Sequence, residues 1–275
     1  MAVATVSDTL ADNADLGCRS VTGLVRAVDR WIYVFMAATF IVVTLTGFVP
    51  DAIENVAAIK AGQRPPFPIV LHVHAILMAS FLLLLLAQTT LMATGRDGLH
   101  QRIGRVAVLL VPAIVVVGFI LVPTTYHGVW NMAQTAPAGT RDQLRHLILV
   151  LDNVALLQVR IGILFPFFIA IALAARRTDS GLHKRMMILA TAVPLAAATD
   201  RIDWLPDTFQ TSPLSSDLSI LGLVSPMLLW DILRWRTIPR AYFIWIAVSL
   251  VVSIPVYTLW NTQWWQSAVP HLMGV

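Results

Sequence analysis

Charged side chains are scarce in this chain. Asp, Glu, Lys and Arg make up only 12% of its 275 residues, whereas soluble domains carry roughly 25%. Hydrophobic residues make up 57%, and the mean hydropathy is +0.76. This composition excludes a soluble globular protein, and it is the opposite of the low-hydrophobicity, high-charge composition of disordered chains. The formal net charge of +4 therefore describes basic residues distributed about a bilayer, and no nucleic-acid partner is expected.

Cysteine and the common catalytic motifs are also lacking. Cys18 is the only cysteine, which excludes an intramolecular disulfide and a cysteine-based metal cage. The sequence has no phosphate-binding glycine loop, no CxxC motif and no Ser-His-Asp arrangement in a recognisable context. ATP-driven transport by this chain alone is therefore not expected.

Long apolar runs are what the sequence does have. A helix needs about 20 largely apolar residues to cross a hydrocarbon core of about 30 Å, and a backbone in lipid must satisfy its own hydrogen bonds. Two runs are short by this measure, but Arg185 and Arg234 near their ends can snorkel to the interface and lengthen them. We therefore predict an all-α, polytopic membrane helix bundle with seven transmembrane helices. The predicted spans are Trp31–Pro50, Phe67–Gly95, Val106–Tyr126, His146–Ala175, Met186–Thr199, Leu218–Trp230 and Ala241–Trp260.

The distribution of basic residues predicts the orientation of these spans. Lys and Arg concentrate in cytoplasmic loops, so the face with more of them is the inner one. With a cytoplasmic N-terminus and a periplasmic C-terminus, five basic residues lie outside, and Arg160 lies within the membrane. We expect a multi-pass protein of a bacterial inner membrane, in contact with the lipid bilayer. The thirteen inner residues are Arg19, Arg26, Arg30, Arg96, Arg102, Arg105, Arg176, Arg177, Lys184, Arg185, Arg234, Arg236 and Arg240.

Three regions follow from this topology. Residues 1–30 are predicted to form a polar cytoplasmic N-terminal tail, residues 31–261 the seven-helix membrane domain, and residues 262–275 a Trp-rich tail along the outer interface. The segments 51–66, 127–145 and 200–217 are predicted to be the longer outer connections, because they are rich in Pro, Gly, Asn and Asp.

One motif occurs twice. Gly-Leu-His-x-Arg begins at Gly98 and again at Gly181, an offset of 83 residues, and each copy opens a new span after an arginine-bearing inner turn. This predicts a repeated helical hairpin. In one interpretation, the His and Arg of each copy meet lipid phosphate at the inner interface. In the other, His100 and His183 form one site across the repeat.

These residues also carry a resemblance. The stretch from His72 to Arg201 resembles an uncharacterised family of bacterial multi-pass membrane proteins with a repeated Leu-His-x-Arg motif. The resemblance implies a membrane bundle but no established activity. A second resemblance, in layout alone, is to four-helix di-haem b-type cytochromes, whose histidines near both faces ligate two haems. The positions that match the family are His72 or His74, Gln88, Arg96–Gly104 with one extra residue, His183–Met187 and Arg201.

Polar residues within the spans are candidate functional groups, because ionisable side chains are costly in lipid. His146, Asn153 and Arg160 recur every seven residues, which places them on one face of a helix. His72 and His74 are two residues apart, so at most one of them faces a site on a regular helix. The outer group comprises His72, His74, His146, Asp152, Asn153, Arg160, Asp200 and Arg201, with Asp203 close by.

Four functions suit these residues. A haem b would be held by a histidine of the second span and His146, with Arg160 or Arg201 pairing a propionate, and the protein would exchange electrons with quinone. A transition metal bound by His74, His146 and Asp200 would make a metal-dependent membrane hydrolase. A transporter without a cofactor is the third alternative. The fourth is an accessory subunit of another membrane protein, in which Arg160 and an aspartate form a buried pair that fixes helix packing.

Overall fold

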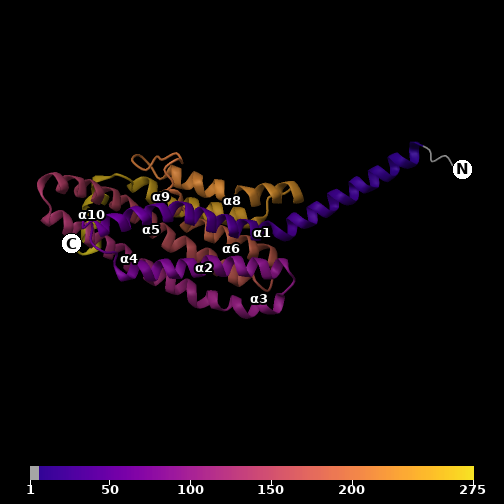
Figure 1. Ribbon diagram of the computed structural model, residues 1–275, viewed down its shortest axis with the longest axis horizontal. Helices are drawn as coiled ribbons and strands as arrows, with labels where there is room; N and C mark the ends of the chain where they lie inside the picture. Colours follow the sequence, from indigo (N-terminus) through magenta and orange to yellow (C-terminus); the bar gives the residue numbers. More distant parts are fainter. Residues whose placement is uncertain (1–5) are drawn as a thin grey trace.

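The computed structural model describes the backbone of residues 6–275 and the side chains of residues 23–275. Every element in this part of the chain is helical, which confirms the predicted all-α class. The helices run along the long axis of the molecule, and α1 extends beyond the bundle at one end (Figure 1). The elements are α1 (Val6–Lys60), α2 (Ile69–Ala93), α3 (Asp97–Gly104), α4 (Val106–Thr135), α5 (Ala138–Ala175), α6 (Ser180–Ala192), the 3-10 helix η1 (Val193–Leu195), α7 (Ala196–Thr199), α8 (Leu214–Trp235), α9 (Arg240–Leu259) and α10 (Gln263–Met273).

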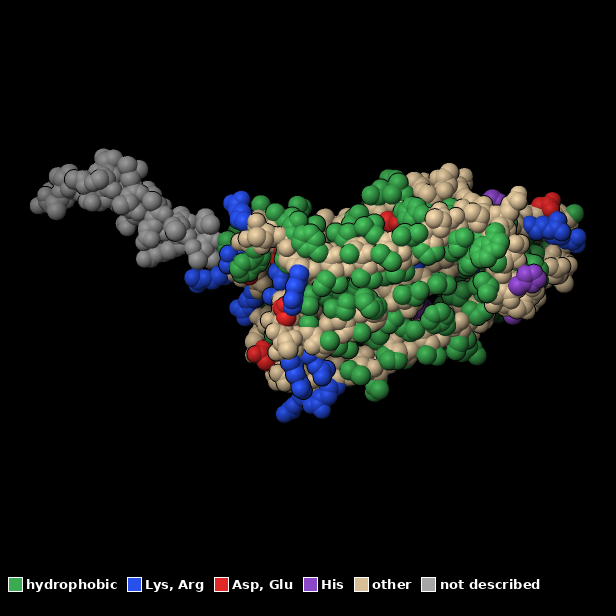
Figure 2. Space-filling view, turned by 180° about the vertical axis from the view of Figure 1, so that it is seen from behind, with side chains coloured by type: hydrophobic (Ala, Val, Ile, Leu, Met, Phe, Trp, Pro, Cys, Tyr) green, Lys and Arg blue, Asp and Glu red, His purple; other side chains and the backbone are tan. Residues whose placement is uncertain are grey.

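Within the described residues, six helical segments are long and apolar enough to cross a membrane, namely α1, α2, α3 with α4, α5, α8 and α9. Exposed apolar side chains cover the middle of the molecule, and Lys and Arg side chains gather at one end (Figure 2). This Arg-rich end contains the α2–α3, α5–α6 and α8–α9 turns. So large an exposed apolar surface belongs in lipid. The chain therefore has the architecture of a multi-pass membrane protein.

The fifth predicted span, Met186–Thr199, corresponds to an interrupted helix and is not among the six segments above. α6 gives way to η1, and α7 completes the segment at Thr199. Pro194 explains the break, because it has no N–H to donate and its ring clashes with the preceding turn. Seven spans and a cytoplasmic N-terminus remain predictions. The start of α1 and the C-terminal α10 do lie at opposite ends of the molecule, as an odd number of crossings requires (Figure 1).

The predicted outer connections are partly helical. α1 continues to Lys60, and only Ala136 and Pro137 separate α4 from α5. The segment 127–145, predicted as a longer outer connection, is therefore almost entirely helical. Pro137 disfavours helical backbone at the residue before it, and Ala136 is extended, with ψ of 150°, so α4 ends there. The irregular connections that remain at this end are residues 61–68 and residues 200–213.

The two predicted tails are also helical in the described part of the chain. The backbone of residues 6–30 belongs to α1, and residues 263–273 form α10. α10 packs against α4 and α5 and buries Trp265 and Val269. The Trp265 Nε1 donates to the backbone carbonyl of Asp152 at 2.6 Å, which ties α10 to the bundle.

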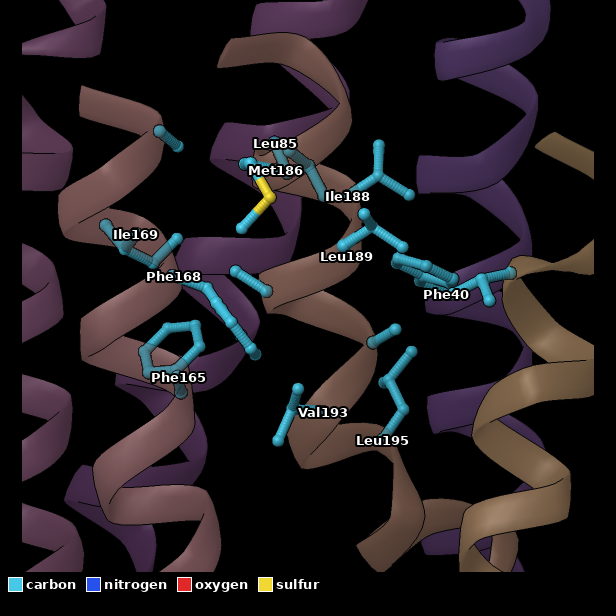
Figure 3. Packing of buried hydrophobic residues seen from close by; sticks show 14 of the residues in the cluster. Phe40, Leu85, Phe165, Phe168, Ile169, Met186, Ile188, Leu189, Val193 and Leu195 are labelled. Atoms are coloured by element: carbon cyan, nitrogen blue, oxygen red, sulfur yellow. The ribbon is translucent and has the colours of Figure 1, made fainter. Parts of the chain in front are cut away.

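A large apolar cluster holds the helices together. Phe40 of α1, Phe168 of α5 and Leu189 of α6 are fully buried in it and converge in Figure 3. Phe81 of α2 packs edge-on against Phe165 of α5, with ring centroids 5.3 Å apart. α6 supplies consecutive buried residues, so the interrupted helix lies at the centre of the bundle.

The closest helix approach in this core predicts a strong effect of one added methyl group. A Cβ at Gly47 of α1 would overlap the backbone carbonyl of Ala198 in α7, which no rotamer change can relieve. We expect Gly47→Ala to lower the free energy of unfolding by about 1–3 kcal/mol. The control is Gly222→Ala in α8, where the added Cβ meets nothing within 4 Å. Thermal unfolding in detergent micelles checks this, and equal melting temperatures for the two variants would contradict it.

Candidate functional site

A buried ion pair lies near the end of the bundle opposite the Arg-rich end. Arg160 of α5 is only 3% exposed, and its Nη1 lies 2.7 Å from Oδ1 of Asp217 at the start of α8. The same nitrogen donates to Ser253 Oγ of α9 at 3.2 Å. The Tyr257 hydroxyl of α9 donates to Asp217 Oδ2 at 2.7 Å. Arg160, Asp217 and Tyr257 form what we call the Arg160 triad.

A second group of the same composition lies near the Arg-rich end. Arg185 of α6 donates from Nε to Asp231 Oδ2 at 2.7 Å and from Nη2 to Oδ1 at 2.5 Å, a bidentate pair. The Tyr242 hydroxyl donates to Asp231 Oδ2 at 2.7 Å. All three residues are buried. Arg185, Asp231 and Tyr242 form the Arg185 triad.

The two triads connect the same pair of helices at two depths. Both aspartates belong to α8 and are fourteen residues apart, about 21 Å along the helix. Both tyrosines belong to α9, and each arginine comes from the core helices α5 or α6. α8 and α9 are therefore attached to the core by a charged contact near each membrane face.

A cavity of about 200 Å³ lies beside the Arg185 triad. α1 contributes Asp29 and Tyr33, and α6 contributes Lys184, whose Nζ lies 4.9 Å from the Tyr33 ring centroid. The Asp29 carboxylate accepts from Trp230 Nε1 and from Arg234 Nε, both at 3.0 Å. The Arg185 triad thus has a polar space between it and the Arg-rich end.

The predicted pairing of Arg160 with an aspartate is confirmed, but its partner Asp217 was not among the predicted residues. The Arg185 triad was missed entirely, because Arg185 was expected at the lipid interface. A signal was present in the sequence. Asp217 and Asp231 are two heptads apart, which places both on one face of α8. The spacing of the two aspartates could not identify their arginine partners, because those arginines belong to other helices.

The two histidines near the start of α2, His72 and His74, have different environments. His72 is exposed and lies edge-on to Phe67, with ring centroids 6.2 Å apart. His74 faces α4, where a Cβ at Gly118 would lie 3.7 Å from its Cε1. The His74 Nδ1 is buried and has no hydrogen-bond partner among the described residues. His74 is therefore the histidine that faces the bundle.

The predicted seven-residue face of α5 does not form one site. His146 is exposed, two turns closer to the helix start than Asn153. Asn153 instead holds the α9–α10 turn, since its Nδ2 donates to Asn261 Oδ1 at 2.6 Å and its Oδ1 accepts from the Asn261 N–H at 3.0 Å. The buried Asp152 accepts from the Tyr126 hydroxyl at 2.9 Å. These contacts secure α4, α5 and α10 to one another.

The residues after α7 lie near the Arg160 triad. Both carboxylate oxygens of Asp200 accept from the fully buried Ser216 Oγ, at 2.8 and 2.9 Å. Although part of Asp200 is exposed, desolvation of its carboxyl raises the pKa to about 6, against the opposing Ser216 hydrogen bond. Arg201 reaches α1, with Nε 3.6 Å from Asp51 Oδ2, while Asp203 is exposed.

The repeated motif makes a similar contact in both hairpins. The His100 Nδ1 lies 3.4 Å from the backbone carbonyl of Gln88, and the His183 Nδ1 lies 2.7 Å from that of Ala172. With its amide oriented to satisfy both ends, the Gln88 side chain accepts from the Gly104 N–H at 2.9 Å and donates to the His100 Nδ1, which then acts as the acceptor in the first hairpin. Each histidine thus bonds to the helix before it within its own hairpin. These contacts support helix packing in each copy.

The metal ligands expected from the sequence do not meet. No group of three or more His, Cys, Asp or Glu side chains in the described part of the chain could hold a metal ion. The predicted set of His74, His146 and Asp200 is therefore not brought together among these residues, and a metal centre stays a prediction. His146 is exposed on α5, and the Asp200 carboxylate is bound by Ser216. Arg160, expected beside a haem propionate, is engaged by Asp217.

Comparison of the chain with protein-family models, with curated proteins and with solved structures finds no match. The fold is that of a multi-pass helical membrane protein with two Arg-Asp-Tyr triads. The Arg185 triad is buried, whereas in the Arg160 triad only the arginine is buried and Tyr257 is exposed.

Breaking the Arg185–Asp231 ion pair should cost much more stability than replacing both of its partners with apolar residues. Arg185→Met leaves Asp231 buried without a cation, so we expect a loss of about 3–5 kcal/mol in the free energy of unfolding. Adding Asp231→Leu to that variant should restore most of the loss, because it removes the orphaned charge. Denaturant unfolding in mixed micelles measures both changes.

The matched control is the exposed pair Arg145–Asp142, where the distance is 3.9 Å. Arg145→Met should cost less than about 1 kcal/mol. An Arg185→Met variant as stable as this control would show that Asp231 does not depend on the pair.

Proposed function

We propose that the chain is a transporter that moves a small polar solute across the bilayer between α9 and the helices α5 and α6. The observation that carries this proposal is the pair of Arg-Asp-Tyr triads at the two ends of α8 and α9. Ionisable groups inside a membrane bundle mark solute or ion pathways more often than they mark ordinary packing. Two such groups on one helix pair, at different depths, suit the two ends of a pathway.

The chemistry of the triads supports a gating role. Each aspartate is bound by an arginine of a core helix and by a tyrosine of α9, so separation of α8 and α9 from the core breaks the charged contact at that end. Breaking one pair while the other stays closed exposes the pathway to one side only. The polar cavity beside the Arg185 triad provides water that can solvate the separated charges on that side.

The interrupted helix α6–η1–α7 supports the same function. Discontinuous helices near the bilayer midplane form binding sites and hinges in many transporters, because backbone groups released at the break face a cavity between protein helices. Here the break at Val193–Leu195 lies in the central helix between Arg185 and Asp200. The break provides a hinge in the core helix that would line the pathway.

We further propose that the protein acts in a bacterial inner membrane with its N-terminus in the cytoplasm. The gathering of Lys and Arg at one end of the bundle supports this orientation.

Reconstitution into vesicles tests transport. Proteoliposomes with a pH-sensitive dye, or loaded with radiolabelled sodium, chloride or acetate, should show protein-dependent flux of at least one of these probes. Asp217→Asn and Asp231→Asn should each reduce that flux at least tenfold, because a gate contact weakened by about 1.4 kcal/mol or more no longer closes its end while the other end opens, and transport needs the two ends to alternate. Asp142→Asn, at an exposed site, is the control and should leave the flux unchanged.

Folding has to be separated from gating in this test. Tyr257→Phe and Tyr242→Phe remove one hydrogen bond each and keep the buried charges paired. Reduced flux with an unchanged melting temperature supports the gates. Flux that is unchanged in all four triad variants, or absent for every probe in the wild type, would reject the proposal.

A second candidate is a haem or quinone-linked redox protein, alone or with another membrane subunit. The unpartnered Nδ1 of His74 supports it, since a buried imidazole nitrogen without a hydrogen bond is a free ligand. Protein from haem-replete cells should then show a Soret band that shifts with dithionite. His74→Ala should abolish the band and His72→Ala should retain it. A featureless spectrum from the wild type would exclude this candidate.

A further inference from the structure

Polar side chains line one face of α9 from one triad to the other. Tyr242, Trp245, Ser249, Ser253 and Tyr257 are spaced by three or four residues. Because successive residues of an α-helix advance by about 100°, these five side chains fall within an arc of about 120°. α9 packs against α5 and α6, and Tyr242 and Trp245 are buried. We call this set the α9 polar face.

The middle of this face contains hydrogen-bond donors that have no acceptor. The two tyrosines donate to the triad aspartates, and Ser253 accepts from Arg160. Trp245 is 5% exposed, and neither its Nε1 nor the buried Ser249 Oγ has a partner among the described residues. A buried donor left unsatisfied costs about 1–3 kcal/mol, so such groups call for a bound molecule.

A third unpartnered donor continues the same line. Trp260 follows the last turn of α9, eighteen residues or five full turns after Tyr242, and its buried Nε1 also lacks a partner. The unpaired donors therefore lie at successive depths, with Trp245 and Ser249 about 6 Å apart along the helix axis between the triads. They mark the pathway proposed above.

The chemistry of these groups selects the ligand. An indole N–H donates and cannot accept, and the hydroxyls of Ser249 and Ser253 each have a proton left to donate. Asp217 and Asp231, the carboxylates next to this face, are engaged by arginines. A cation finds no free carboxylate here. A proton relay through side chains is interrupted at Trp245, which cannot take up a proton.

We propose that Trp245 and Ser249 bind a small hydrogen-bond-accepting anion, a halide or a short carboxylate, during its passage along α9. This inference rests on the proposed transport function and names its substrate class. The two donors hold the anion from one side. The triads lie toward either end of the same face, and because each aspartate is paired with an arginine they leave no net negative charge there to repel an anion.

Removal of single donors tests the site. Trp245→Phe keeps an aromatic ring and removes the N–H, and Ser249→Ala removes the hydroxyl. In proteoliposomes with a valinomycin-clamped potential, each should reduce uptake of radiolabelled chloride or acetate at least tenfold, the effect of losing one hydrogen bond to a charged group. Trp264→Phe and Ser267→Ala, both at exposed positions of α10, are the controls and should transport like the wild type.

Thermal unfolding separates binding from packing. Chloride or acetate should raise the melting temperature of the wild type, because a ligand that binds only the folded state stabilises it. The same anions should not stabilise Trp245→Phe or Ser249→Ala. Without anion Ser249→Ala should be as stable as the wild type, since it deletes a donor that had no partner. Trp245→Phe also reduces the packing of a buried ring, so a modest loss of stability is expected for it. A large loss of stability in both variants without anion would contradict the site.

The outcomes distinguish the two proposals. Flux of protons or sodium without flux of either anion would leave the transport function intact and overturn the anion site. Anion flux that is unchanged in both donor variants would also overturn the site. Absence of flux for every probe would reject the transport function and the anion site with it.

Discussion

A charge inside a lipid-embedded bundle has to be matched by another protein group, and this requirement determines how α8 and α9 are held. Asp217 and Asp231 would each be very costly in an apolar interior without a partner. Each obtains an arginine from α5 or α6 and a tyrosine from α9. The net contribution of such a pair to stability is small, but breaking it is expensive. The ion pairs therefore determine the position of α8 and α9 more than they add to the stability of the fold.

The rest of the bundle is arranged differently. α1, α2, α5 and α6 supply most of a close-packed apolar cluster, to which α8 and α9 add a few residues such as Met227 and Trp245. The hairpin turns are secured by histidines that bond to the preceding helix. Such cores are rigid and have no discrete alternative arrangement. The boundary between this core and α8 and α9 has two charged contacts, unpaired donors and a broken central helix. Motion in this protein is therefore expected at that boundary, where the contacts can be exchanged for water or solute.

The fold class was readable from the sequence because lipid restricts the backbone to few solutions. Long uncharged runs can only be helices, and the structure has them. The ends of the helices were harder to predict. α4 and α5 continue beyond the apolar runs, through polar residues that still favour helix. At Pro194 the structure has a 3-10 turn, which interrupts the predicted span. Proline identifies the position of such a break but does not determine how the backbone accommodates it.

The candidate site shows where sequence reasoning stops. The chain by itself determined that Arg160 lies among apolar residues and needs a partner, and that His72 and His74 cannot both face the bundle, since both statements depend only on helix geometry within one segment. Tertiary structure alone decided that the partner is Asp217, that Arg185 is buried with Asp231, and that His146 is left exposed. These facts depend on which helices become neighbours and at what depth. The spacing of residues along one helix does not determine how a neighbouring helix is rotated about its axis or how far it is shifted along the bundle.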